Sequence, residues 1–251
     1  MPERGALTVL CLHEAGTSGA IWSALGEALA DHATVLKPDR PGWGETEPPE
    51  GYERTTVTEQ AGFAAAIIQS RGPAVLCGSG IGAVAAIELS LAEPELVAGT
   101  VLIEPPLLSF ATDATSQLTL DVATVRDAVS AGGREAALDA YLTGGLPALG
   151  PGASRIPKEL AAGGPRAASA LFAELSAVPA WERTDAELAA STTPSLIVLA
   201  ADSPALLRTA GLGLSKVLGR SELRETEPGL PHVANARELA AYVDEIAVQP
   251  T

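Results

Sequence analysis

A short apolar run, a turn with three alternating glycines and an apolar helix follow one another between residues 74 and 91. The run Ala74-Val75-Leu76-Cys77 is typical of a buried strand, and the residues from Ala83 onward have an apolar helical face. Between them, Gly78-Ser79-Gly80-Ile81-Gly82 indicates a tight turn, because glycines allow a strand and a helix to pack closely. A strand that enters a helix in this way requires an α/β arrangement.

Strands and helices alternate along most of the chain, which predicts a parallel sheet with helices on both faces. The apolar patterns predict strands at residues 6–13, 34–37, 74–77, 100–104, 196–202 and 222–226, and helices at residues 20–30, 57–69, 83–91 and 234–246.

Residues 107–190 differ from the rest, because they are helical and rich in loops, without a clear strand. Helices are expected at residues 118–129, 134–142 and 167–178, separated by glycine pairs. We therefore predict a core made of residues 1–106 and 191–251, with residues 107–190 as a helical insertion.

The charge of the chain excludes several classes of partner. Sixteen Lys and Arg against 31 Asp and Glu give a net charge of −15, and no basic run or patch is present. Binding to nucleic acid or to an anionic membrane surface is therefore not expected. The N-terminal residues lack a signal-peptide pattern and no apolar run approaches membrane-spanning length, so a cytoplasmic protein is expected.

Metal and cofactor chemistry are not indicated either. The two cysteines, Cys11 and Cys77, fall in predicted buried strands and should be packed, reduced thiols. Two cysteines and three histidines at these spacings do not form a zinc site. The glycines at 78, 80 and 82 have the wrong spacing for a nucleotide-binding turn, so no cofactor is expected.

Five places in the chain resemble, in the same order, motifs of the α/β-hydrolase superfamily. They are His13 with its following turn and Trp22, the loop 39–44, the turn 78–82, the strand and loop 196–202, and Pro231-His232. This resemblance implies the α/β-hydrolase fold, with a mostly parallel sheet and with residues 107–190 as a lid over the active site. It also implies an enzyme that acts on a small molecule, while a homodimer is left open.

The apex of the turn departs from the family, which places its attacking residue there. Small residues lie two before and two after the apex only if the apex is Gly80. Taking Ser79 as the nucleophile instead would put Cys77 and the β-branched Ile81 at the small positions. Gly80 is thus the predicted nucleophile position, and Ser79 is the alternative nucleophile. Cys77 is interpreted as a packing residue.

The resemblance makes His232 the general base and Asp202 the acid that orients it. Without it, Asp202 could equally cap the helix expected near Pro204, and a lone loop histidine would be an ordinary surface residue. Glu104, at the end of the preceding strand, is the alternative acid.

Glu14 is a second departure, since the family usually has glycine after the first-strand histidine. A carboxylate there would repel a developing oxyanion, which argues against ordinary acyl transfer. It could instead be a second acid–base group whose pKa is raised by burial, or it could turn to solvent or to Arg40.

Other residues are candidates for binding the substrate. The backbone N–H groups of Ile81 and Ala15 could bind a substrate oxygen, and His13 and Trp43 lie in the matching loops. The aromatic residues of the insertion could line an apolar pocket or form its core; they are Phe110, Tyr141, Phe172 and Trp181.

Three functions are compatible with these residues. The favoured one is an enzyme in which His232 and Asp202 transfer a proton on a small, mostly apolar carbonyl or hydroxyl compound, without a covalent serine intermediate, as in lyases, cyclases or water-activating hydrolases. The second is a serine esterase that uses Ser79. The third is a binding protein that has kept the pocket and lost catalysis.

Overall fold

The computed structural model describes residues 7–111 and 114–249, and within them the core is one parallel sheet of six strands in the order β2-β1-β3-β4-β5-β6. The strands are β1 Leu7–Leu12, β2 Ala33–Leu36, β3 Ala74–Ser79, β4 Val97–Ile103, β5 Ser195–Ala200 and β6 Ser221–Thr226. The predicted α/β-hydrolase fold is confirmed, and each predicted strand is present. Residue 6, the first of the predicted strands, lies outside the described residues.

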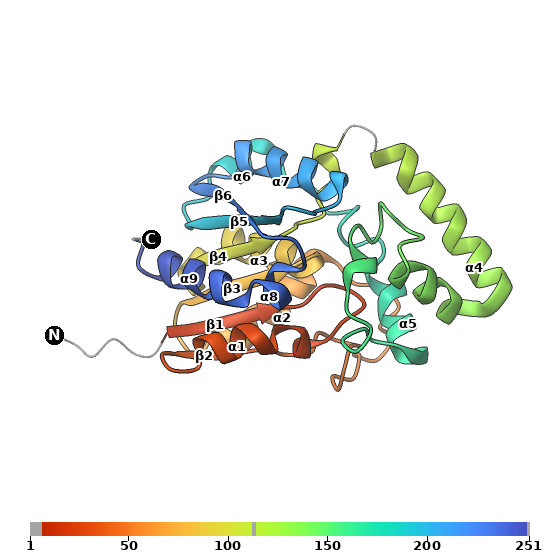
Figure 1. The fold of residues 1–251 in the computed structure, drawn as a ribbon, viewed down its shortest axis with the longest axis horizontal. Helices are drawn as coiled ribbons and strands as arrows, with labels where there is room; N and C mark the ends of the chain where they lie inside the picture. The colour runs from red at the N-terminus through yellow and green to blue at the C-terminus, as the bar shows by residue number, and fades with distance from the viewer. Residues whose placement is uncertain (1–6, 112–113, 250–251) are drawn as a thin grey trace.

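Helices cover both faces of this sheet (Figure 1). One face carries η1 Gly19–Trp22, α1 Ser23–Leu29, α8 Pro231–Ala234 and α9 Ala236–Ala247. The other carries α2 Val57–Ile68, α3 Ile81–Ala92, α6 Asp185–Ala189 and α7 Ala205–Val217, with the short η2 Pro94–Leu96 leading into β4.

Two apolar clusters hold these layers together, one on each face. Alternate residues of the strands belong to opposite clusters: Val75 and Cys77 face α1 and α9, whereas Leu76 faces α2 and α3. Side chains of a strand alternate between its two faces, so a strand that is buried on both faces must be continuously apolar. This requirement is why the strands were recognisable as apolar runs.

The two cysteines lie side by side in the cluster beneath α9. Cys11 of β1 and Cys77 of β3 are register partners, and both are free and fully buried. Burial, and then the neighbouring Cys77 thiol, raise the pKa of the Cys11 thiol well above its ordinary value. The prediction that both are packed thiols is confirmed.

Residues 107–190, called the insert below, contain η3 Leu108–Phe110, α4 Ala114–Leu142, η4 Ala153–Arg155 and α5 Gly164–Glu174, and they end with α6. The helices expected at 118–129 and 134–142 form the two arms of α4, which is interrupted by non-helical backbone at Gly132 and Gly133. Figure 1 shows α4 and α5 together at one end of the sheet. Within the described residues, no helix combines the length and apolar character that crossing a bilayer requires.

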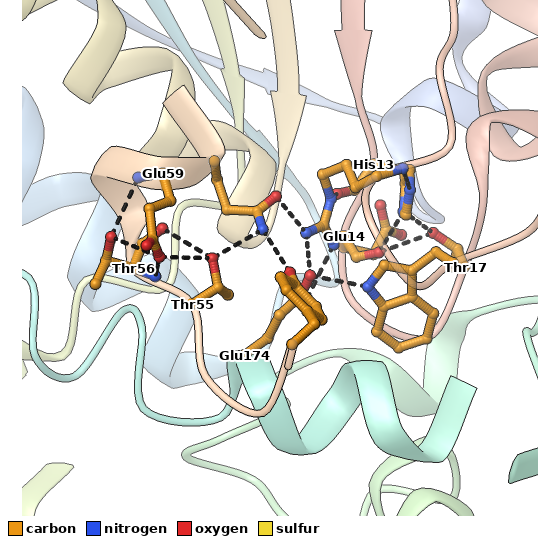
Figure 2. Close-up of polar contacts among 11 residues, drawn as sticks. His13, Glu14, Thr17, Thr55, Thr56, Glu59 and Glu174 are labelled. Carbon is orange, nitrogen blue, oxygen red and sulfur yellow. Dashed lines mark hydrogen bonds and ion pairs between the residues drawn. The ribbon is translucent and has the colours of Figure 1, made fainter. Parts of the chain in front are cut away.

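A buried ion pair ties the insert to the core. The Arg40 guanidinium, in the loop after β2, donates hydrogen bonds through Nη1 and Nη2 to the Glu174 carboxylate at the end of α5. Both side chains are almost fully buried. Gln60 Oε1 also accepts a hydrogen bond from Arg40, and Trp43 Nε1 donates one to Glu174. In Figure 2, Glu174 lies at the centre of these polar contacts, which fix α5 over the strand ends.

Candidate active site

A cavity lies between the insert and the carboxyl ends of β1, β3 and β4. It contains about 820 Å³ of empty space, counting the part open to solvent. Most of its lining is apolar, and much of that lining comes from the insert, including Leu149, Ile156 and Leu171. The polar side chains at its wall are Glu14, Ser79, Glu104, Tyr141, Glu174 and His232. The cavity thus brings together residues that are up to 218 positions apart in sequence (232 − 14).

The residue at the apex of the turn between β3 and α3 has a backbone conformation that residues other than glycine rarely adopt. Gly80 has φ 55° and ψ −128°, and α3 begins at the next residue, Ile81. This backbone conformation is essentially restricted to glycine unless the surroundings impose it. The glycines on either side have packing reasons, because a Cβ at Gly78 or at Gly82 would collide with main-chain atoms of Gly82 or Leu12, respectively.

Glu14 fills the space in front of this apex. A Cβ built on Gly80 would lie 2.7 Å from the Cβ of Glu14. The Ser79 hydroxyl donates a hydrogen bond to Glu14 Oε2, and Glu14 Oε1 lies 3.4 Å from His232 Nε2. The Glu14 carboxylate therefore lies between the serine and the histidine. It turns neither to solvent nor to Arg40, which were the alternatives open from the sequence.

The pKa of Glu14 is shifted in the direction opposite to the one expected from burial. Burial raises its pKa, but the neighbouring His232 imidazole and the hydrogen bond from Ser79 together outweigh burial and lower the pKa from its ordinary 4.5 to about 2. The expected raised pKa was wrong, because the carboxylate has the Ser79 hydroxyl and the His232 ring beside it. Glu14 is therefore ionised at neutral pH.

His232 lies in the short helix α8 rather than in a loop, and it is fully buried. Its ring packs against Trp22, with 4.5 Å between the ring centres. Neither ring nitrogen forms a hydrogen bond with a described residue. Among these residues, the ion-pair contact of the ring is with Glu14. The imidazole is thus held by packing and by Glu14.

The expected hydrogen bond between His232 and Asp202 is absent. The half-exposed Asp202 carboxylate accepts hydrogen bonds from Gly229 N at 2.9 Å and from Arg155 Nη2 at 3.0 Å. The Gly229 hydrogen bond outweighs burial and, with Arg155, lowers the pKa of Asp202. Asp202 does not cap α7 either, since no side chain caps that helix.

Glu104, the alternative acid, also has Arg155 as its partner. It follows β4 with φ 47° and is buried. Arg155 Nη1 donates to both of its carboxylate oxygens at 2.7 Å, and Ser203 Oγ donates at 2.6 Å. One arginine of the insert therefore binds both residues from which the acid was expected.

Two of the predicted substrate-binding residues do not line the cavity. His13 Nε2 accepts a hydrogen bond from Arg40 N at 2.9 Å, so the ring proton is on Nδ1, which donates to Glu14 O at 2.8 Å. Burial, and then the Arg40 charge, lower the pKa of His13 to about 3. Trp43 is fully buried and packs edge-on against His13. His13 thus joins the loop that carries Glu14 to the main chain at Arg40, and Figure 2 shows it beside Glu14.

The other two predicted substrate-binding positions, Ala15 and Ile81, do line the cavity. Of the four aromatic residues considered in the insert, only Tyr141 is at its wall. Trp181 instead donates a hydrogen bond to Glu88, and Phe172 packs under Arg134. Arg155 and Glu174 were missed, because a single charged residue in a loop-rich segment carries no sequence signal of its partner.

No group of three His, Cys, Asp or Glu residues that could hold a metal ion occurs in the part of the chain that the structure describes. The polar side chains at the cavity wall offer three carboxylates, an imidazole and two hydroxyl groups, those of Ser79 and Tyr141.

Similar folds occur in several solved structures. An esterase from Thermogutta terrifontis is 19% identical, with a TM-score of 0.69 over 95% of this chain and 88% of that one. NosK from Streptomyces actuosus is 21% identical (TM-score 0.67, 96% and 97% covered), and a hydrolase from Oleispira antarctica is 17% identical (TM-score 0.68, 98% and 92% covered). At these identities the likeness concerns the fold alone.

No curated protein has a significant sequence match to this chain. Residues 9–245, by contrast, match the sequence model of the alpha/beta hydrolase family. The chain therefore belongs to the alpha/beta hydrolase family, and its family and fold support an enzyme of the α/β-hydrolase type.

Proposed function

We propose that this protein is an enzyme that moves protons on a small, mostly apolar carbonyl or hydroxyl compound, with Glu14 and His232 as the acid–base pair and no covalent serine intermediate. The observation that carries the proposal is the position of Glu14. Its carboxylate occupies the space in front of Gly80, the nucleophile position, and contacts both Ser79 and His232.

The pair has the properties that acid–base catalysis needs. Histidine is the usual general acid–base residue of enzymes, and the ionised Glu14 carboxylate beside the ring can orient it and stabilise a proton that it takes up from the substrate. The apolar cavity wall would exclude water from the reacting group, which strengthens the electrostatic interactions inside the cavity. The backbone N–H groups of Ala15 and Ile81 remain candidate donors to a substrate oxygen.

A covalent step at residue 80 has no side chain to form it. Ser79 is one residue away, at the end of β3, and its hydroxyl donates to Glu14 rather than to His232. A carboxylate at this place would also repel the oxyanion of a tetrahedral intermediate. These features support a reaction of the lyase, cyclase or water-activating type.

One observation favours a second candidate, a hydrolase that attacks with Ser79. The ionised Glu14 accepts the hydroxyl proton of Ser79 in a hydrogen bond, which is the geometry of a base beside a nucleophile. Several proteins of similar fold are described as esterases or hydrolases, so esters belong in any substrate panel.

Four single variants distinguish these candidates: Glu14→Gln, His232→Ala, Ser79→Ala and, as a control, His32→Ala. His32 is a half-exposed histidine that pairs with Asp244 and does not line the cavity. Each protein is assayed for hydrolysis of p-nitrophenyl esters and for exchange of the α-protons of aryl ketones with deuterium by NMR.

The proposal predicts proton exchange that is lowered about 100-fold or more in Glu14→Gln and His232→Ala, and is largely kept in Ser79→Ala and His32→Ala. Labelling by a fluorophosphonate that disappears in Ser79→Ala would instead establish the serine hydrolase. Full activity in His232→Ala would refute both. Tight ligand binding without turnover of any substrate would indicate a binding protein.

A further inference from the structure

The phenol of Tyr141 is a polar group at the cavity wall that the proposed chemistry does not use. Tyr141 lies near the end of α4 and lines the same cavity as Glu14 and His232. None of the hydrogen bonds found for the described residues involves its hydroxyl. The hydroxyl is also not among the completely buried, unpartnered polar atoms, so it stays accessible from the cavity.

The other two tyrosines differ in this respect. The Tyr52 hydroxyl accepts a hydrogen bond from Gln60 Nε2 at 2.9 Å, and the Tyr242 hydroxyl donates one to Glu238 Oε1 at 2.5 Å. A buried phenol normally finds a partner, because desolvating it without one is unfavourable. An unpartnered phenol that opens on a cavity is therefore free to bind a ligand.

The ring of Tyr141 is held in one orientation by two glycines. A Cβ on Gly16 would lie 3.3 Å from Cε1 of the ring, and a Cβ on Gly150 would overlap its opposite edge. The main chain thus packs directly against both edges of the ring. A donor that is fixed before the ligand arrives loses little conformational freedom on binding.

The phenol is also kept as a donor. Burial raises the pKa of Tyr141 well above its ordinary value, and the negative charges of Glu14 and Glu174 raise it further. The proton therefore stays on the oxygen over the whole physiological pH range, so the group offers an O–H to an acceptor.

The charges around the cavity restrict what that acceptor belongs to. Three carboxylates line it, those of Glu14, Glu104 and Glu174, and no Lys or Arg does among the described residues. Two of these carboxylates already pair with a guanidinium group, Glu174 with Arg40 and Glu104 with Arg155. An anionic ligand would meet carboxylates without a free cation, so the cavity disfavours it.

From these observations we infer that the substrate is an uncharged, largely apolar molecule with an acceptor oxygen, and that Tyr141 recognises it by donating a hydrogen bond to that oxygen. The inference rests on the cavity being the substrate site of the proposed function. It adds that the substrate is uncharged, and it names the residue that binds the substrate oxygen.

Three probes of similar shape test it by binding alone: acetophenone, ethylbenzene and benzoate. Dissociation constants are measured by ligand-observed NMR for the unmodified protein, for Tyr141→Phe and for Tyr242→Phe. Tyr242→Phe is the matched control, because it removes a phenol hydroxyl on α9, away from the cavity lining. Thermal unfolding checks that both variants fold; loss of the hydroxyl alone leaves the packing of the Tyr141 ring intact.

The unmodified protein should bind acetophenone about fivefold to tenfold more tightly than ethylbenzene, as expected for one hydrogen bond. Tyr141→Phe should abolish that preference without changing the affinity for ethylbenzene, and Tyr242→Phe should keep it. Benzoate should bind at least about tenfold more weakly than acetophenone at low salt, and Glu14→Gln should narrow this difference.

A preference for acetophenone that survives in Tyr141→Phe, or benzoate bound as tightly as acetophenone, would overturn the inference. Because these measurements need no turnover, the two proposals can fail separately. Tyr141-dependent binding without proton exchange or hydrolysis would reject the proposed function and keep the recognition by Tyr141.

Discussion

A side chain at residue 80 would place its Cβ 2.7 Å from the Cβ of Glu14, so the two positions compete for the same space. Real Cβ atoms do not approach other side-chain carbons this closely, because the interior is close-packed. The glycine at the apex of the turn and the glutamate after the first-strand histidine are therefore structurally coupled. The two positions at which the sequence was predicted to depart from the family pattern therefore share one contact.

The first prediction concerns this coupling. Gly80→Ser should lower the free energy of unfolding by about 2 kcal/mol, because it adds the clash to a backbone conformation that disfavours side chains. In a Glu14→Gly background the same substitution should cost about 1 kcal/mol less, because the clash is gone. Urea unfolding of the unmodified protein, the two single variants and the double variant measures this difference in unfolding free energy. Additive effects would show that the two positions do not compete.

The second prediction is that Glu14 and His232 act as a unit. Glu14→Gln and His232→Gln should each lower kcat/KM by at least about 100-fold, and the double variant should be little worse than either single one. The reason is that Glu14 Oε1 lies 3.4 Å from His232 Nε2, so removing either partner disrupts the same contact. Steady-state kinetics on the best substrate of the panel provide the test. Losses that multiply would indicate independent roles.

The third prediction concerns the buried pair Arg40–Glu174, which attaches α5 to the core. Glu174→Gln should lower the free energy of unfolding by about 3 kcal/mol, because it leaves a buried guanidinium without its counter-charge. The matched control is Glu47→Gln, which breaks the exposed pair with Arg166 and should cost less than about 0.5 kcal/mol. Denaturant unfolding compares them, and equal costs would contradict the role given to this pair.

The fourth prediction is a pH dependence of stability with two windows, one from His13 and a lower one from Glu14, which overlap between about pH 4.5 and 3. His13 has a folded-state pKa of about 3 against 6.5 in an unfolded chain, so below pH 6.5 the unfolded state takes up a proton that the folded state does not. Stability should therefore fall as the pH drops from 6.5 toward 3, by up to about 1.4 kcal/mol per pH unit from this group. His13→Gln should remove that slope.

Glu14 produces the lower window. Its pKa is about 2 in the folded protein against 4.5 unfolded, so its contribution is complete above pH 4.5 and is lost as the pH falls toward 2. Glu14→Gln should therefore flatten the profile only below about pH 4.5. Unfolding free energies measured at a series of pH values give both slopes. An unchanged slope between pH 6.5 and 4.5 in His13→Gln would contradict the assignment of a buried neutral imidazole.

Much of the fold was predictable because its signals are local. Strands buried on both faces must be continuously apolar, and β3 is such a run. A Cβ at Gly78 would meet main-chain atoms of the same strand–turn–helix unit, whereas one at Gly82 would meet Leu12 of the neighbouring β1. The spacing of the two glycines is nevertheless a local pattern, and it located the turn. The glycine pair at 132 and 133 was a local signal too, because the backbone there is non-helical and separates the two arms of α4, where two helices were expected.

The partners of the charged residues were not predictable in the same way. Asp202 and Glu104 were expected to serve His232, and both bind Arg155 instead. The contact joins the insert to two strand ends, and no local pattern specifies which of several carboxylates a distant arginine reaches. The direction of the Glu14 pKa shift failed for the same reason, since burial is readable from a sequence whereas the donors that offset it are not.

The amino-acid order by itself determined the parallel sheet, the position of the glycine turn and the presence of a carboxylate at residue 14. Hydrophobic periodicity and backbone sterics act over a few residues and are written directly in the sequence. Only the tertiary structure decided that this carboxylate lies between Ser79 and His232, that Arg155 binds both expected acids, and that the Tyr141 phenol opens on the cavity. Such contacts depend on how the insert and distant segments of the core pack together, and packing is a property of the whole chain.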